Sequence, residues 1–239
     1  LENKITFGAN LALTSNFMKN EERCRELLEK AKHANLTIIN IGLESGSERL
    51  RKEVLLRPPY TNDELIRLCK LAKTYDIKVN FFVLIGLPGE TLKDYLETVK
   101  VARMSQPNSC LLSIFYPYLG TDLAKQAVSM GLVHSRDLVE SDFSKAERSR
   151  SILNLEGFSS RRIRIEYVIF WFRVYIGHWS TVRVLTTMLK SILRAYPNIY
   201  SKFLFLRNNF TYLTKKKIAN NKLLGTRIDI VETSITILL

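Results

Sequence analysis

Two turns of this sequence place a carboxylate beside a hydroxyl directly after an apolar run. Glu44 and Ser45 follow the run at 36–43, and Glu90 and Thr91 close a glycine-rich turn about forty residues later. A carboxylate or a hydroxyl can hydrogen-bond the hydroxyls of a sugar diol, and glycine lets a ligand approach the backbone closely. These two turns are therefore the first places to look for ligand chemistry.

The runs that precede these turns have the pattern of strands buried on both faces. They are rich in β-branched residues and lack a helical period, and each is followed by a polar turn and an amphipathic helix. This order predicts parallel βα units with strands over 36–43 and 78–85, and similar runs at 5–13 and 109–115 extend the series to four units. Ligand sites of such folds lie at the carboxyl ends of the strands. We therefore predict an α/β fold, a partial (β/α) barrel followed by a mainly helical C-terminal extension.

Composition divides the chain into three parts. Residues 1–134 carry the βα pattern, residues 135–160 are polar and Ser-rich and are interpreted as a linker, and residues 161–239 are basic, aromatic and mainly helical. The net charge of +13 comes mostly from 161–227, where Glu166 is the only acid. A helix packed on the barrel is the first interpretation of this region, and an interfacial membrane-docking helix is the second. No run reaches the roughly eighteen uncharged apolar residues of a membrane span.

The cysteines do not form a recognisable pattern. Cys24, Cys69 and Cys110 are far apart and show no C-x-x-C spacing, so neither a disulfide framework nor a contiguous metal knuckle is indicated. This favours a reducing, cytoplasmic setting, with peripheral membrane contact as an alternative. No signal peptide is visible in this sequence, which starts inside a strand-like stretch without methionine, so we interpret it as a fragment.

Three motifs in a fixed order resemble the radical S-adenosylmethionine (radical SAM) enzymes, most closely the branch with an N-terminal cobalamin-binding domain. They are IGLESGS at 41–47, IGLPGET at 85–91 and YPYLGT at 116–121. The resemblance implies a six-stranded partial βα barrel that holds a 4Fe-4S cluster and S-adenosylmethionine at the carboxyl ends of its strands. The four strands predicted here would be the third to the sixth.

The resemblance also implies which residues bind S-adenosylmethionine. Glu44 and Ser45 would hydrogen-bond its ribose or amino-acid part, and Arg57 would lie near its carboxylate. Glycine in the second turn would admit the adenosine, and the aromatic pair after the last strand would flank the adenine. The implied set is Glu44, Ser45, Arg57, Ile85, Gly86, Phe115 and Tyr116. The structural alternatives are that Ser47 and Thr91 only cap helices and that Glu90 only favours a helix start.

One family feature is missing from the sequence. The cluster is held by cysteines in a C-x-x-x-C-x-x-C loop, and no such loop occurs here. We therefore expect this chain not to cleave S-adenosylmethionine reductively as it stands. The resemblance implies that the intact enzyme takes electrons from a donor such as ferredoxin or flavodoxin. It would then generate an adenosyl radical or support cobalamin-dependent methyl transfer.

The substrate is open to several interpretations. The helical, aromatic stretch 161–206 favours a small-molecule or lipid-like substrate. The alternative is an RNA-modifying, methylthiotransferase-like protein whose basic tail binds phosphates. A third interpretation is an inactive, truncated barrel that acts only as a binding module for a nucleotide-like ligand or a partner. A non-radical, aldolase-like barrel would require a lysine or paired carboxylates at strand ends, whereas Lys78 stands at a strand start.

Overall fold

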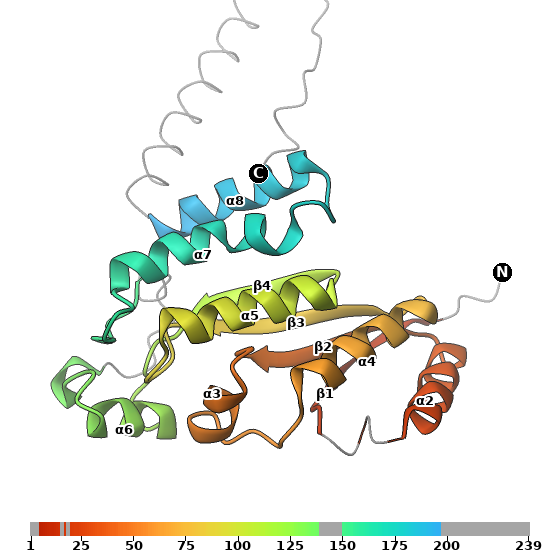
Figure 1. The fold of residues 1–239 in the computed structure, drawn as a ribbon, viewed down its shortest axis with the longest axis horizontal. Helices are drawn as coiled ribbons and strands as arrows, with labels where there is room; N and C mark the ends of the chain where they lie inside the picture. Colours follow the sequence, from red (N-terminus) through yellow and green to blue (C-terminus); the bar gives the residue numbers. More distant parts are fainter. Residues whose placement is uncertain (1–4, 15–16, 18–19, 139–149, 197–239) are drawn as a thin grey trace, which may run out of the picture.

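The computed structural model describes residues 5–14, 17, 20–138 and 150–196. Four parallel strands lie side by side in the order β1-β2-β3-β4 and alternate with helices, which confirms the predicted α/β class (Figure 1). The elements are β1 (Phe7–Leu11), α2 (Glu21–His33), β2 (Leu36–Glu44), α3 (Glu48–Glu53), α4 (Asn62–Thr74), β3 (Lys78–Ile85), α5 (Leu92–Ser105), β4 (Ser109–Ile114), α6 (Asp122–Ser129), the 3-10 helix η1 (Ser135–Asp137), α7 (Ser160–Tyr175) and α8 (Thr181–Ala195). The parts of the predicted linker and C-terminal region at 139–149 and 197–239 lie outside the described residues.

Hydroxyl side chains start the helices that follow the strands. Thr61 accepts a hydrogen bond from the backbone N–H of Glu64, and Thr91 accepts one from that of Asp94. In both cases the carboxylate reaches back to the N-cap backbone, which completes a capping box. Ser47 caps α3 in the simpler way. The capping roles predicted for Ser47 and Thr91 are therefore confirmed.

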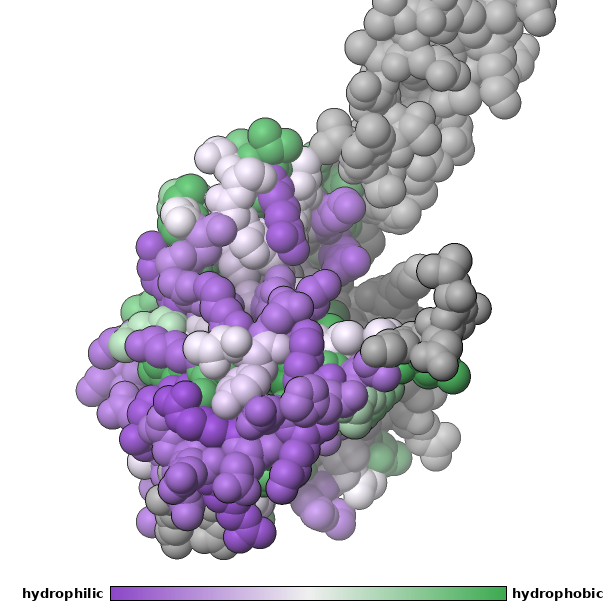
Figure 2. Space-filling view, turned by 90° about the vertical axis from the view of Figure 1, so that its right-hand side faces the viewer, coloured by the Kyte–Doolittle hydropathy of each residue, from purple (hydrophilic) through white to green (hydrophobic). Residues whose placement is uncertain are grey.

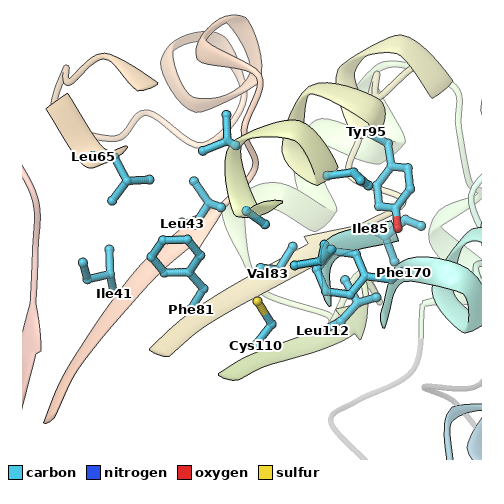
Figure 3. Packing of buried hydrophobic residues seen from close by; sticks show 14 of the residues in the cluster. Ile41, Leu43, Leu65, Phe81, Val83, Ile85, Tyr95, Cys110, Leu112 and Phe170 are labelled. Atoms are coloured by element: carbon cyan, nitrogen blue, oxygen red, sulfur yellow. The ribbon is translucent and has the colours of Figure 1, made fainter. Parts of the chain in front are cut away.

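One face of the sheet forms the hydrophobic core. Alternate residues of the strands, among them Ile41, Leu43, Phe81, Val83 and Leu112, are almost completely buried. They fill the space between the sheet and the helices α4, α5 and α7, as Figure 3 shows. Because side chains alternate along a strand, the residues between them face the opposite side of the sheet. That opposite face is the inner face of the half-barrel.

The inner face carries a row of polar side chains that crosses all four strands. The amide of Asn40 donates to Oδ1 of Asn10 at 3.1 Å, the amide of Asn80 donates to Oδ1 of Asn40 at 3.1 Å, and the hydroxyl of Ser109 donates to Oδ1 of Asn80 at 2.7 Å. The four residues lie opposite one another in the strand pairing. We refer to this row as the asparagine ladder.

Helices α7 and α8 pack against each other, and α7 also lies against α5 and β4 (Figure 1). Two hydroxyls fasten α7 to the half-barrel. The hydroxyl of Tyr95 donates to the backbone carbonyl of Glu166 at 3.2 Å, and the hydroxyl of Tyr175 lies 3.2 Å from Sγ of Cys110. The interpretation of this region as a helix packed on the barrel is thus confirmed. No helix in the described residues is long and apolar enough to span a membrane.

The described end of the predicted linker is part of the core. Ser151, Leu153, Leu155 and Phe158 are buried, and the ring centroid of Phe158 lies 5.8 Å from that of Tyr95. The polar composition of 135–160 concealed the apolar Leu153, Leu155 and Phe158, which belong to the hydrophobic core. The packing therefore continues across the boundary that the sequence predicted at residue 160.

Candidate ligand site at the strand ends

Two of the predicted ligand residues meet at the carboxyl end of β2. The guanidinium of Arg57 donates from Nη2 to Oε1 of Glu44 at 2.8 Å. Glu44 has a positive φ of 55°, and the pairing of β2 with β3 shifts register between Gly42 and Glu44. A Cβ on Gly42 would lie 2.9 Å from Oε1 of Glu44, so glycine leaves the space in which this carboxylate lies.

The Glu44–Arg57 pair retains hydrogen-bonding capacity. The side chain of Glu44 is 17% exposed and that of Arg57 is 42% exposed. Burial raises the pKa of Glu44, and the neighbouring Arg57 opposes this rise. In the described part of the chain the second carboxylate oxygen has no hydrogen-bond partner, and Arg57 uses only one of its side-chain nitrogens. Glu44 can therefore accept hydrogen bonds from hydroxyl or ammonium groups of a ligand, and Arg57 can donate to a carboxylate of the same ligand.

A buried arginine that sequence reasoning missed supports this pair. Nη1 of Arg51 donates to the carbonyl of Ser45 at 2.8 Å and to Oδ1 of Asn62 at 2.9 Å, and Nη2 donates to the carbonyl of Tyr60 at 3.1 Å. Arg51 thereby ties the turn after β2 to the loop that carries Arg57. On a short helix with other charged residues, nothing in the sequence distinguished this arginine from its exposed neighbours.

The hydroxyl of Ser45 is not brought together with the Glu44–Arg57 pair. Ser45 is fully buried, its Oγ lies 3.4 Å from Oγ1 of Thr98, and it accepts a hydrogen bond from the backbone N–H of Ser47 at 3.2 Å. The side chain belongs to the packing of this turn on α5. No local pattern in the sequence indicated that α5 covers the turn, and the predicted contact of Ser45 with a ligand stays a prediction.

The turn that follows β3 is covered by the protein on the side that faces α7, so this side is closed to a ligand. Ile85 buries its side chain in the core, and its carbonyl accepts from the backbone N–H of Phe115 at 2.8 Å. Gly86 has a φ of 84°, and its N–H donates to Oε2 of Glu90. A Cβ on Gly86 would lie 3.2 Å from Cδ1 of Ile163 in α7. The buried carboxylate of Glu90 thus stabilises the conformation of this turn.

The aromatic pair after β4 lies at the same edge of the sheet as Glu44, because the strands are parallel. Phe115 and Tyr116 are 7% and 9% exposed, and the ring centroid of Tyr116 lies 5.2 Å from that of Tyr118. The predicted contact of this pair with adenine stays a prediction, as does the predicted contact of Ile85 and Gly86 with adenosine.

The described residues do not fit an iron–sulfur cluster. They contain no group of three or more histidine, cysteine, aspartate or glutamate side chains that could hold a metal ion. Cys24, Cys69 and Cys110 are all buried. Burial raises the pKa of the Cys69 and Cys110 thiols to about 12, whereas iron is ligated by thiolates. We therefore derive no chemical step through a cluster from these residues.

The fold and the site define a class of protein: a parallel βα half-barrel with a charged pair at the carboxyl ends of its strands. Residues 4–102 match the sequence profile of the Radical SAM superfamily. This part of the chain belongs to the radical SAM superfamily, as its motifs indicated. Membership implies S-adenosylmethionine and a 4Fe-4S cluster as the family's cofactors.

Several curated proteins are similar to part of this chain. A tRNA-2-methylthio-N(6)-dimethylallyladenosine synthase of Thermotoga petrophila is 27% identical over 131 residues, which are 54% of this chain and 27% of the relative. The synthase of the same name from Akkermansia muciniphila is 32% identical over 88 residues, 36% of this chain and 19% of the relative. A putative methylthiotransferase of Methanocaldococcus jannaschii is 29% identical over 105 residues, 44% of this chain and 23% of the relative. The chain thus spans about a quarter of the length of the curated relatives that it matches.

Proposed function

We propose that this chain supplies S-adenosylmethionine-binding strand ends to a radical SAM enzyme that modifies RNA. The observation that carries the proposal is the Glu44–Arg57 pair at the end of β2, inside the region that matches the superfamily. S-adenosylmethionine presents a ribose diol and an ammonium group, which suit the carboxylate of Glu44, and a carboxylate, which suits the guanidinium of Arg57. When bound, the cofactor supplies the radical or methyl chemistry, and these residues bind and orient it.

RNA is favoured over a lipid-like substrate for two reasons. The preference for a lipid-like substrate rested on the aromatic residues of the C-terminal region, and most of those in α7 serve packing: Tyr167, Phe170, Trp171 and Tyr175 are buried, whereas Phe172 is exposed. Side chains committed to the core are not available to line a substrate pocket. In addition, the relatives described above carry names that refer to tRNA modification or methylthio transfer.

The remaining cofactor and partner assignments are predictions for the whole enzyme. They comprise a 4Fe-4S cluster with ligands outside the described residues, and a reducing partner such as ferredoxin or flavodoxin. The cobalamin domain also stays a prediction. These assignments depend on parts of the enzyme other than the strand ends described here.

Glu44→Gln is expected to weaken the binding of S-adenosylmethionine roughly tenfold to a hundredfold, because a charge-assisted hydrogen bond to the ligand is replaced by a neutral one. Isothermal titration of the 239-residue chain with S-adenosylmethionine measures the dissociation constant. Arg57→Gln is expected to weaken binding as well, since the ligand carboxylate loses its guanidinium partner.

Two further variants make this test specific. Glu53→Gln removes an exposed carboxylate of α3 that pairs with Arg49 at 3.5 Å, and it should leave the affinity unchanged. Gly42→Ala places a methyl group where the Glu44 carboxylate lies, so the flexible side chain must move while the backbone stays. It should therefore weaken binding without unfolding the protein. Equal affinities of wild type and Glu44→Gln would refute the assignment of Glu44.

A further inference from the structure

A second cleft lies at the opposite edge of the sheet, where the strands begin. It has a volume of about 640 Å³ and is enclosed by the starts of β3 and β4, the end of α4 and the turn between α7 and α8. Figure 2 views the molecule from this end and shows a mainly hydrophilic surface. The eight residues of β3 separate this cleft from the other edge of the sheet by roughly 25 Å. We refer to it as the amino-edge cleft.

The amino-edge cleft is positively charged. Lys73, Lys78 and Arg183 line it with exposed side chains, and none of them has an acidic partner among the described residues. Asp76 is the one carboxylate in the described lining, and Nζ of Lys32 binds it at 3.1 Å. The cleft therefore has three cations whose charge no neighbouring carboxylate of the described chain neutralises, which suits an anionic ligand.

One of these cations is held in a fixed orientation. The rings of Tyr175 and Trp179 stack with centroids 3.7 Å apart, and the guanidinium carbon of Arg183 lies 3.5 Å from the centroid of Trp179. A guanidinium stacked on a ring keeps its N–H groups at its own edge, where they can bind two oxygens of a phosphate. Because Tyr175 and Arg183 cover the two faces of Trp179, this ring is not available to stack with a nucleic-acid base.

We propose that the amino-edge cleft binds phosphate groups of an RNA backbone without selecting bases. The inference rests on the proposed RNA substrate and extends it to a contact far from the candidate cofactor site. A membrane surface is a poorer fit to the cleft itself, because it would require apolar side chains among the lining residues, and the exposed Val182 and Leu185 of α8 lie outside the lining. The exposed lining is instead polar: besides the three cations it includes Gln106, Asn108 and His178.

The test is a salt titration of RNA binding. Fluorescence anisotropy with labelled oligonucleotides of about 20 uridines or about 20 adenosines gives the affinity of the full chain as salt is raised from roughly 50 mM to roughly 300 mM. Each phosphate contact to a single strand contributes about 0.7 to the slope of log affinity against log salt. The double variant Lys78→Gln/Arg183→Gln should therefore lower the slope by about 1.4 and weaken binding at the lowest salt roughly fiftyfold, equally for both RNAs.

Two other variants separate charge from geometry. Lys190→Gln removes an exposed cation of α8 outside the cleft and should change neither affinity nor slope. Arg183→Lys keeps the charge but loses the planar fork, so it should weaken binding by less than Arg183→Gln does. Thermal unfolding of each variant, followed by circular dichroism, verifies that the fold is intact.

The possible outcomes distinguish a failure of the cleft assignment from a failure of the proposed RNA substrate. If RNA binds but the double variant matches wild type, or if only one of the two RNAs is affected, the cleft assignment is refuted and the RNA substrate stands. If neither RNA binds, or if vesicles rich in phosphatidylserine bind through these residues instead, the cleft assignment and the RNA substrate both fall. The titration with S-adenosylmethionine is independent of all these results.

Discussion

Replacing Gly46 by alanine is expected to lower the free energy of unfolding by about 3 kcal/mol or more. A Cβ on Gly46 would lie 2.5 Å from Cα and 2.7 Å from N of Thr98, and 2.8 Å from the carbonyl oxygen of Glu97. All three atoms belong to the backbone of α5, so no side-chain rotation relieves the clash. Moving the turn away would also strain the hydrogen bond from the Gly46 N–H to Oγ1 of Thr98, now 2.8 Å long. Urea unfolding followed by circular dichroism measures the loss.

Gly120→Ala is the matched control for Gly46→Ala. A Cβ on Gly120 would meet nothing within 4 Å, but the residue has a φ of 86°. Its replacement therefore carries only the backbone strain of a left-handed residue, about 1 kcal/mol. If the two variants were equally stable, the close approach of the first turn to α5 would not be important for stability.

The second large effect is a fall in stability as the pH rises from about 5 to about 8. Burial raises the pKa of Glu90 from 4.5 to about 8, although backbone N–H groups of Gly86 and Leu87 donate to Oε2 and oppose this rise. Oε1 is buried and has no hydrogen-bond partner in the described part of the chain. Between these two pKa values the folded protein binds more protons than the unfolded chain, so stability decreases as the pH increases. The loss is up to about 5 kcal/mol and is complete above about pH 8.

Glu90→Gln is expected to remove most of this dependence. Glutamine can still accept both backbone hydrogen bonds, but it has no charge to bury. The variant should be slightly less stable than wild type near pH 5, since its buried amide group has no acceptor, and more stable above about pH 8. Asp94, whose pKa is lowered to about 2, affects stability only at more acidic pH. Parallel stability curves of the two proteins across this range would contradict the role of Glu90.

The secondary structure was largely predictable because its signals are local. The predicted strand at 78–85 coincides with β3, and the predicted helix after Thr91 is α5. A β-branched run and a hydroxyl N-cap depend on a few neighbouring residues, and tertiary packing did not override them. The strand predicted at 5–13 is shorter in the structure, where β1 spans Phe7–Leu11.

The candidate site was predicted only in part, because the directions of its side chains depend on residues far away in the sequence. Glu44 and Arg57, which the resemblance implied as separate ligand contacts, meet as an ion pair, and the sequence did not predict this contact between them. Ser45 is instead covered by Thr98 of α5, and Gly86 is covered by Ile163 of α7. No pattern near Ser45 or Gly86 indicates which later helix will lie over it.

The sequence did contain a signal for the asparagine ladder that only the strand register makes recognisable. Asn40 lies on the same face of β2 as Gly42, and Asn80 lies on the same face of β3 as Phe82, because residues two apart in a strand point to the same side. Aligning the two strands on their turns would not have paired these asparagines, because Asn40 lies four residues before the end of β2 and Asn80 lies five residues before the end of β3. Without the pairing partners, an asparagine within an apolar run indicates only a less favourable strand residue.

The asparagine ladder opposes an assembly error that hydrophobic patterning does not penalise. If a strand slips by one residue, its apolar side chains turn to the wrong face, and the error is costly. A slip by two residues keeps every apolar residue on its own face. In this sheet, however, it would set the amide of Asn40 against Lys78 or Phe82 in place of Asn80 and break the bonds of Asn40 across the sheet. The polar row therefore favours one alignment among those that burial alone treats as equal, and it does so on the face of the sheet that the helices α4, α5 and α7 do not cover.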